Sequence, residues 1–184
     1  MTRRRSDTLD DFYHYYPTVV AVITVRSGEE VNAMPAAWHS PVARVPPLYG
    51  VAIAPKRHTH GLIAQAKSFA VNFLPLEKVE LISSLGSSSG RDGAKATDAS
   101  LWLDDDRYPG APVLADAYAA YQCTLEAMQS FGDHDWIVGR IVAVHTIEEA
   151  FDADGVITMN GHTPALYIGK YQFIAPSRPA GAGK

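Results

Sequence analysis

The segment VVAVITVRSGEEVNAMPAAWHSP, residues 19–41, carries the clearest information on the architecture of this chain. Residues 19–25 are β-branched and nearly all apolar, a pattern typical of a strand that is buried on both faces. Residues 26–30 are polar and contain Gly28, which favours a hairpin turn. We therefore expect the chain to begin with a strand and a hairpin.

Two further strands are predicted at residues 48–54 and 69–74. Between them we expect a short helix, capped by Thr59, that carries apolar side chains on one face. The apolar spacing over residues 76–85 predicts a second helix, with Gly86 as its C-terminal stop. The stretch 87–100 is small and polar, and is predicted to be a loop.

The C-terminal half adds an antiparallel hairpin and a last strand to this pattern. Residues 121–128 and 136–147 alternate between apolar and polar side chains, and residues 129–135 separate them. Residues 166–174 are expected to close the sheet, and residues 176–184 form a tail. Strands without regular βαβ spacing indicate a mainly β fold with helical insertions, which we interpret as an antiparallel barrel.

The composition narrows the function classes. The chain has 184 residues, 47% of them hydrophobic, which predicts a single domain over 1–184. A net charge of -4 argues against nucleic acid as a partner. The single cysteine, Cys123, excludes an intramolecular disulfide framework, and no apolar run is long enough to cross a membrane. We expect a cytoplasmic protein.

The first candidate site directly follows the hairpin turn. Small residues beside a proline let a ligand approach the backbone, whose N–H groups then donate to a flat heteroaromatic rim. The alternative is an edge strand that contains a proline and a core tryptophan. The candidate residues are Asn32, Ala33, Met34, Pro35, Ala36, Ala37 and Trp38.

The second candidate site is PKRHT, residues 55–59, between a strand and the expected helix. Lys56, Arg57, His58 and Thr59 bring two cations, a hydroxyl and the positive end of a helix dipole to one place, which suits a phosphate dianion. The alternative is a capped helix preceded by solvated basic residues.

Three further residues have candidate roles. His134 is flanked by carboxylates, so it is suited to stabilise an anion or relay a proton, although a polar turn is the alternative. Lys95 lies in the polar loop and is either a ligand contact or a solvated charge. Cys123 is predicted to be a buried structural thiol. No spacing indicates a metal site.

Taken in order, these motifs resemble those of the flavin reductase-like proteins with an FMN-binding split barrel. The matching features include Tyr16-Pro17 before the first strand, NAMPAAWHSP, PKRHT, Lys95, and Gly132-Asp133-His134. The form NAMPAAWHSP is more similar to the flavoredoxin-like branch than to reductases that supply monooxygenases. The resemblance covers roughly residues 10–175.

The resemblance implies a function. In such proteins the stretch that matches residues 32–38 lines the flavin ring, the stretch that matches residues 56–59 holds the phosphate, and the matching histidine lies close to the flavin. It also implies a homodimer. We therefore expect an FMN-binding oxidoreductase that takes hydride from NAD(P)H and passes electrons to a small acceptor or to free flavin. The alternatives are a non-catalytic electron carrier, and a barrel for another phosphorylated aromatic or a haem.

Overall fold

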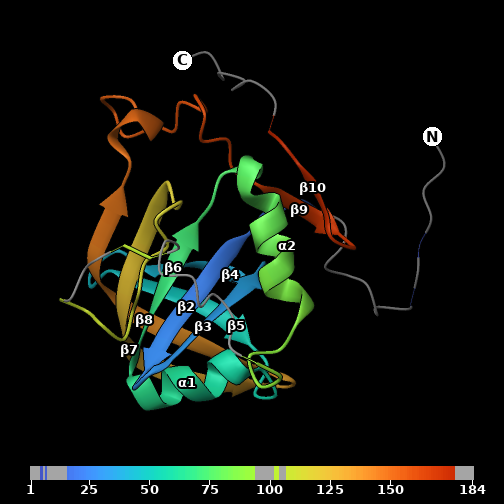
Figure 1. Ribbon diagram of the computed structural model, residues 1–184, viewed down its shortest axis with the longest axis vertical. Helices are drawn as coiled ribbons and strands as arrows, with labels where there is room; N and C mark the ends of the chain where they lie inside the picture. Colours follow the sequence, from blue (N-terminus) through green and yellow to red (C-terminus); the bar gives the residue numbers. More distant parts are fainter. Residues whose placement is uncertain (1–4, 6, 8–15, 94–101, 104–106, 177–184) are drawn as a thin grey trace.

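The computed structural model describes residues 5, 7, 16–93, 102, 103 and 107–176, and its main body is one antiparallel sheet that curves into a split barrel with β3 and β4 as its edges (Figure 1). The sheet has seven strands in the order β3-β2-β6-β7-β8-β5-β4. The strands are β2 (Ala21–Ser27), β3 (Glu30–Ala36), β4 (His39–Ala43), β5 (Leu48–Ile53), β6 (Ser68–Phe73), β7 (Ala119–Phe131) and β8 (His134–Thr146). The expected mainly β, antiparallel architecture is confirmed.

The N-terminal hairpin follows the prediction closely. Val22, Ile23 and Val25 in β2 are completely buried, as expected for a strand with core on both faces. β2 and β3 pair from Ala21 with Ala36 to Ser27 with Glu30. Because β3 is an edge of the sheet, it tolerates a proline, and alternate backbone N–H groups point away from β2.

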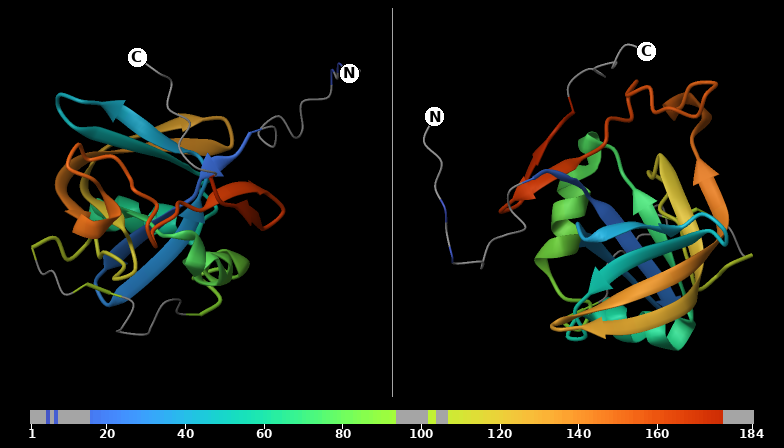
Figure 2. Two further views of the ribbon diagram at one scale, coloured as in Figure 1. Left: turned by 90° about the horizontal axis from the view of Figure 1, so that it is seen from above. Right: turned by 180° about the vertical axis from the view of Figure 1, so that it is seen from behind.

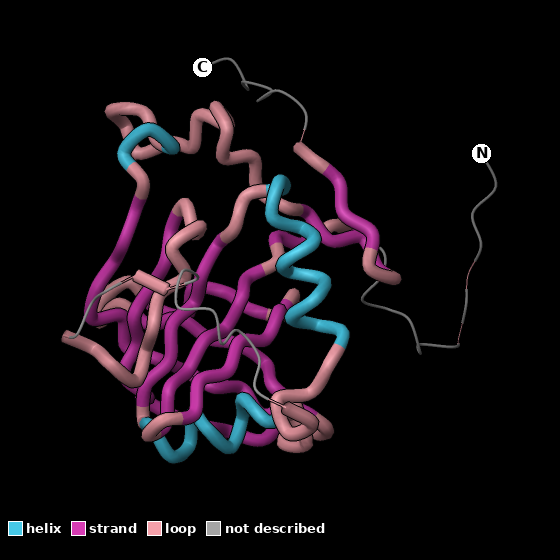
Figure 3. The backbone as a smooth tube through the Cα atoms, in the orientation of Figure 1, coloured by secondary structure: helices cyan, strands magenta, loops and turns pink. Residues whose placement is uncertain are grey.

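Helix α1 (His58–Ala66) lies across one end of the barrel (Figure 3). The prediction of a helix was correct, but Thr59 does not cap it. The N-cap residue is Arg57, and the Thr59 hydroxyl instead accepts a hydrogen bond from Asn32 Nδ2 at 2.7 Å. This tertiary contact holds Thr59 inside the first turn, where it is buried.

The second helical segment starts with a 3-10 turn, η2 (Leu76–Lys78), and continues as α2 (Val79–Ser87). Gly86 does not end α2, contrary to the prediction. A Cβ at Gly86 would lie 3.0 Å from Pro35 Cγ, so the absent side chain lets α2 approach β3 closely. The glycine therefore serves helix packing rather than helix termination.

The segment 166–174 differs most from its prediction, because it is not one strand and does not close the seven-stranded sheet. It forms the hairpin β9 (Leu166–Gly169) and β10 (Gln172–Ile174), which joins β1 (Thr18–Val19) in a separate sheet of order β1-β9-β10. Figure 2 shows this hairpin beside α2 in both views. At its tip Gly169, Lys170 and Tyr171 all have positive φ, of 105°, 49° and 59°.

Two clusters of apolar side chains position these parts. One fills the barrel and includes Ile23, Val71 and Phe69. The other, which includes Leu85 and Ala165, joins α2 to the sheet and to the β9–β10 hairpin. A short 3-10 turn, η4 (Glu148–Ala150), follows β8. Within the described part of the chain, no helix has the length and apolar character that crossing a membrane requires.

Candidate functional site

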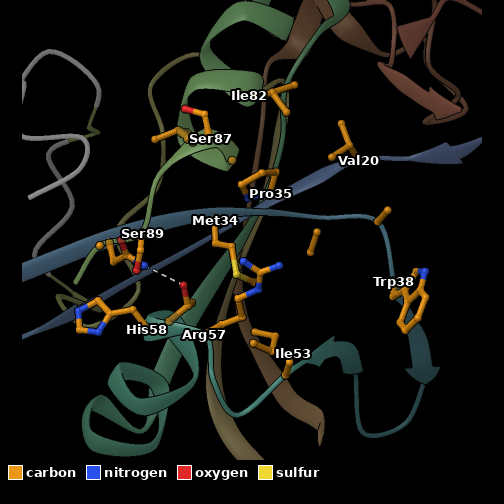
Figure 4. A pocket seen from close by; sticks show the side chains of 18 of the residues that line it. Val20, Met34, Pro35, Trp38, Ile53, Arg57, His58, Ile82, Ser87 and Ser89 are labelled. Atoms are coloured by element: carbon orange, nitrogen blue, oxygen red, sulfur yellow. Dashed lines mark hydrogen bonds between the residues drawn. The ribbon is translucent and has the colours of Figure 1, made fainter. Parts of the chain in front are cut away.

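A cavity of about 720 Å³, here called the main cavity, lies among β3, the start of α1, the end of α2 and the β9–β10 hairpin. Figure 4 shows Ser89 and His58 at one end of it and Trp38 at the other, with Met34 and Arg57 between them. Its volume falls in the range of roughly 300–1,000 Å³ that is usual for sites of small molecules and cofactors. The structure thus brings the first and second candidate stretches to one place.

At one end, the main cavity meets the first turn of α1. The first backbone N–H groups of a helix have no partner inside the helix and carry the positive end of its dipole. The Arg57 side chain makes no capping hydrogen bond here; its carbonyl oxygen accepts from His60 N–H at 3.1 Å, which leaves the N–H groups of His58 and Thr59 for a ligand. This arrangement favours a bound anion.

A buried polar atom lies beside these donors. Asn32 is only 3% exposed, and its Nδ2 donates to Thr59 Oγ1 at 2.7 Å. Its Oδ1 has no hydrogen-bond partner in the described part of the chain. An unpaired buried carbonyl costs free energy on the order of 1–3 kcal/mol. Because Asn32 lines the main cavity, a ligand with a hydroxyl group would satisfy this atom.

The same end is closed by a chain segment that the sequence had assigned only to a polar loop. A Cβ at Gly90 would lie 2.5 Å from Asn32 Oδ1 and 2.8 Å from His58 Cδ2. The loop after α2 therefore approaches the floor of the cavity as closely as glycine allows. His58 is held from the opposite side, where its Nε2 pairs with Glu30 Oε1.

The two basic residues of PKRHT have different positions. Arg57 lines the main cavity, and its guanidinium has no hydrogen-bond or ion-pair partner among the residues that the structure describes. Lys56 is exposed and is not brought into the cavity lining. Lys95 lies outside the described residues. Of the three cations predicted as ligand contacts, only Arg57 is placed at the cavity.

The middle of the cavity wall is the edge strand β3 and the residues that follow it. Met34, Pro35, Ala36, Ala37 and Trp38 line the main cavity. Ala33, which was predicted with them, is instead completely buried in the cluster between α2 and the sheet. Ala33 belongs to the same cluster as Ile82 and Leu85 of α2, and this packing covers its side chain.

His134 begins β8 and reaches the main cavity from the hairpin tip. Its ring centroid lies 4.9 Å from that of Trp38, and its Nδ1 is 2.8 Å from Asp133 Oδ1. The hydrogen bond from His134 lowers the pKa of the Asp133 carboxyl. A carboxylate at Nδ1 keeps a proton on that nitrogen and directs Nε2 elsewhere.

A second histidine–carboxylate pair, which the sequence did not suggest, fixes the hairpin tip to α1. His60 Nε2 lies 2.7 Å from Asp135 Oδ2, and both side chains are mostly buried. The hydrogen bond from His60 lowers the pKa of Asp135. The pair connects the helix that carries Arg57 to the strand that carries His134.

His58 and His60 therefore pair with separate carboxylates, those of Glu30 and Asp135. In the described part of the chain, no group of three His, Cys, Asp or Glu side chains is arranged to hold a metal ion. Cys123 is buried, as predicted, and burial raises its pKa to about 12. This thiol is therefore protonated near neutral pH and is not suited to act as a nucleophile.

Sequence reasoning missed the opposite end of the cavity lining. Tyr167, Tyr171 and Phe173 reach it from the β9–β10 hairpin, more than 120 residues after β3. The apolar run Leu166-Tyr167-Ile168 indicates a strand, but no local pattern indicates which cavity that strand reaches. Ser87 and Ser89 were equally hidden in a stretch that was interpreted as a loop.

The family model of the flavin reductase like domain matches residues 12–174. An uncharacterized protein of Aeropyrum pernix is 33% identical over 162 residues, which are 88% of this chain and 61% of that protein. The chain thus spans about three fifths of that relative's length. An NADH-dependent FMN reductase of Streptomyces nodosus subsp. asukaensis is 31% identical over 134 residues, which are 73% of this chain and 71% of that protein.

Among solved structures, an FMN-binding protein from Thermus thermophilus with bound 1-cyclohex-2-enone is 40% identical and superposes with a TM-score of 0.87, covering 100% of this chain and 99% of that one. A second structure, an FMN-binding protein from Thermus thermophilus with bound p-hydroxybenzaldehyde, is 39% identical to this chain. A putative flavin reductase with a split barrel domain from Shewanella frigidimarina, 17% identical, has a TM-score of 0.80 over 91% of this chain and 86% of that one. The fold described above is this split barrel.

Proposed function

The chain belongs to the flavin reductase-like family, and from that premise we propose that it is an FMN-binding oxidoreductase. It takes hydride from a reduced nicotinamide and passes electrons to a small acceptor or to free flavin. Support for the donor comes from the Streptomyces relative described as an NADH-dependent FMN reductase. Support for a small acceptor comes from the Thermus protein, which binds a conjugated ring ketone and an aromatic aldehyde.

The observation that carries the proposal is the unpaired Asn32 carbonyl at the start of α1. A flavin mononucleotide has a phosphate for the α1 N–H groups and, next to it, a chain of hydroxyl groups. One of these hydroxyls would donate to Asn32 Oδ1, which is buried and has no partner among the described residues. The residues present therefore fit this cofactor at its phosphate end.

Different groups that line the main cavity would bind different parts of the cofactor. The Arg57 guanidinium and the first N–H groups of α1 bind the phosphate, since charge-assisted hydrogen bonds are the stronger ones. Backbone N–H groups of residues 33–38, other than Pro35, which has none, donate to the rim of the flavin ring. Asp133 accepts a hydrogen bond from His134 Nδ1 and so orients the imidazole, whose Nε2 donates to negative charge in the cavity when the ring carries both protons.

When bound, the flavin supplies the ability to accept hydride and to release electrons, which no side chain of this cavity supplies. The protein therefore needs no nucleophile, in agreement with the buried, protonated Cys123. Its contribution is to bind and orient the cofactor and to exclude water from the ring.

Two measurements test this proposal. The absorbance spectrum of the purified protein with added FMN should show bound oxidised flavin, which a pyridoxal phosphate-like ligand or a haem does not reproduce. Oxidation of NADH or NADPH should then exceed the free-flavin background. A flavin spectrum without nucleotide oxidation would favour the electron-carrier alternative, whereas no flavin binding would refute the proposal.

The homodimer that the resemblance implies stays a prediction. Light scattering coupled to size-exclusion chromatography measures it directly, because the mass of one chain is 19.9 kDa.

A further inference from the structure

We propose that Tyr171, at the tip of the β9–β10 hairpin, contacts the conjugated ring of the second reactant in the main cavity. This inference rests on the proposed function, because the second reactant is the molecule that exchanges electrons with a bound flavin. It assigns to this chain a binding residue that none of the sequence motifs contains.

The hairpin lies at the end of the cavity opposite the phosphate-binding groups. Val19 pairs with Leu166, and the N–H group of Val20 donates to Ala165 O at 3.1 Å. The hairpin is therefore attached beside Val20. Figure 4 shows Val20 and Trp38 far from Ser89 and His58. Tyr171 consequently reaches the end that would hold the flavin ring rather than its phosphate.

The three aromatic side chains of the hairpin do not share one role. The rings of Tyr167 and Phe173 are 5.6 Å apart and pack in the cluster that joins the hairpin to α2. Tyr171 belongs to none of the hydrophobic clusters formed by the described residues, and it is 67% exposed. It nevertheless lines the main cavity. Its ring contributes to the cavity and not to the core.

The backbone at the tip supports the same interpretation. Lys170 and Tyr171 both have left-handed φ, of 49° and 59°, which a two-residue hairpin turn requires. Glycine or asparagine adopts this conformation with little strain, whereas tyrosine does not. A strained residue is retained where its side chain is needed, and such residues gather at binding sites. An exposed tyrosine held this way over a cavity indicates a ligand contact.

The chemistry of this end defines the class of ligand. Its lining includes aromatic and aliphatic side chains from Val20, Trp38, Tyr167 and Phe173, with the His134 imidazole next to Trp38, while Arg57 lies between this end and that of Ser89. Such walls favour a flat, uncharged, conjugated ring that stacks on an aromatic face. The nicotinamide of the hydride donor and the ring of a small conjugated carbonyl acceptor both have this chemistry.

The experiment uses the FMN-loaded protein with two probes. In one arm, p-hydroxybenzaldehyde is titrated and the change in flavin absorbance gives its Kd. In the other arm, anaerobic stopped flow gives the NADH concentration at which the rate of flavin reduction is half-maximal. We expect Tyr171→Ala to raise the Kd of p-hydroxybenzaldehyde, the half-maximal NADH concentration, or both, by roughly three- to tenfold, as the loss of a ring contact predicts. The probe whose value rises identifies the ring that Tyr171 contacts.

Matched variants separate binding from structure. Tyr171→Phe keeps the ring and should retain wild-type affinity for the probes. Tyr16→Ala removes another exposed tyrosine, 55% exposed and outside the main cavity, and should change nothing. Tyr171→Gly should weaken probe binding like Tyr171→Ala but raise the melting temperature, because glycine relieves the left-handed backbone.

The outcomes distinguish the inference from the proposed function. Unchanged probe affinity in both arms for Tyr171→Ala overturns the inference alone. An equal loss of FMN affinity, measured by quenching of flavin fluorescence, also overturns it, since Tyr171 would then contact the cofactor. Melting temperatures below wild type for both Tyr171→Ala and Tyr171→Gly would show a structural role and contradict it. Failure of the wild type to bind FMN overturns both.

Discussion

Replacement of Arg57 by alanine is the sharpest test of the phosphate end of the cavity. The Arg57 guanidinium lines the main cavity and has no partner in the described part of the chain, so the substitution breaks no interaction of the folded protein that the structure records. A hydrogen bond to a charged group contributes about 1.5–3 kcal/mol. Because Arg57 is exposed and solvent screens the pair, we expect the lower value, a roughly tenfold rise in the Kd for FMN.

The assay compares two ligands and two neighbouring cations. Fluorescence quenching gives the Kd of FMN and of riboflavin, which lacks the phosphate, for each variant. Riboflavin should bind Arg57→Ala within about twofold of wild type, and the loss for FMN should shrink at high salt. Lys56→Ala is the matched control, because Lys56 is exposed and outside the cavity lining. An equal loss for both ligands, or an equal loss in Lys56→Ala, would refute the assignment.

Three further perturbations test the fold around the site. Thr59→Val removes the acceptor of a buried 2.7 Å hydrogen bond and should lower the free energy of unfolding in urea by about 1–3 kcal/mol, with Thr59→Ser as the control that keeps it. Gly50→Ala would place a Cβ 2.3 Å from Trp136 Cζ2 and should cost about 1–3 kcal/mol in a thermal melt, whereas Gly61→Ala, with open space around it inside α1, should not destabilise. Burial lowers the pKa of His39 below its usual 6.5, so the unfolded chain takes up the proton first as pH falls. Wild-type stability should therefore decrease more between pH 7 and pH 5 than that of His39→Gln, and parallel decreases would contradict this assignment.

The strands of the barrel were predictable because their patterns are local. The apolar run in β2 and the alternation in β7 and β8 report which faces are buried, and burial on those faces is what the sheet provides. The predicted 121–128 and 136–147 hairpin was correct in place and type, although both strands extend further toward the turn. Backbone hydrogen bonds between β7 and β8 extend each strand beyond the residues whose alternation predicts it.

The helix ends were less predictable, because distant residues decide them. Thr59 has the side chain of a capping residue, but Asn32 takes its hydroxyl as an acceptor across the barrel end. Gly86 has the position of a stop, but Pro35 lies against it, and α2 continues past it. In both cases, a contact between segments about 30 to 50 residues apart outweighs a preference worth about 1 kcal/mol.

The two ends of the main cavity differ in how far the sequence could reveal them, and the difference has a physical cause. The phosphate end is formed by the start of α1 and the edge strand β3, and in each segment a few consecutive residues are enough to predict ligand binding. The other end depends on the pairing of β1 with β9, a ladder of only two residue pairs that leaves no periodic signal. The two central residues of the hairpin turn, Lys170 and Tyr171, are likewise not the asparagine or glycine that is typical of such turns. A binding end attached by so short a ladder can change its side chains without disturbing the barrel. We therefore expect relatives with the same fold to share the phosphate end and to differ at the position of Tyr171 where their second reactants differ.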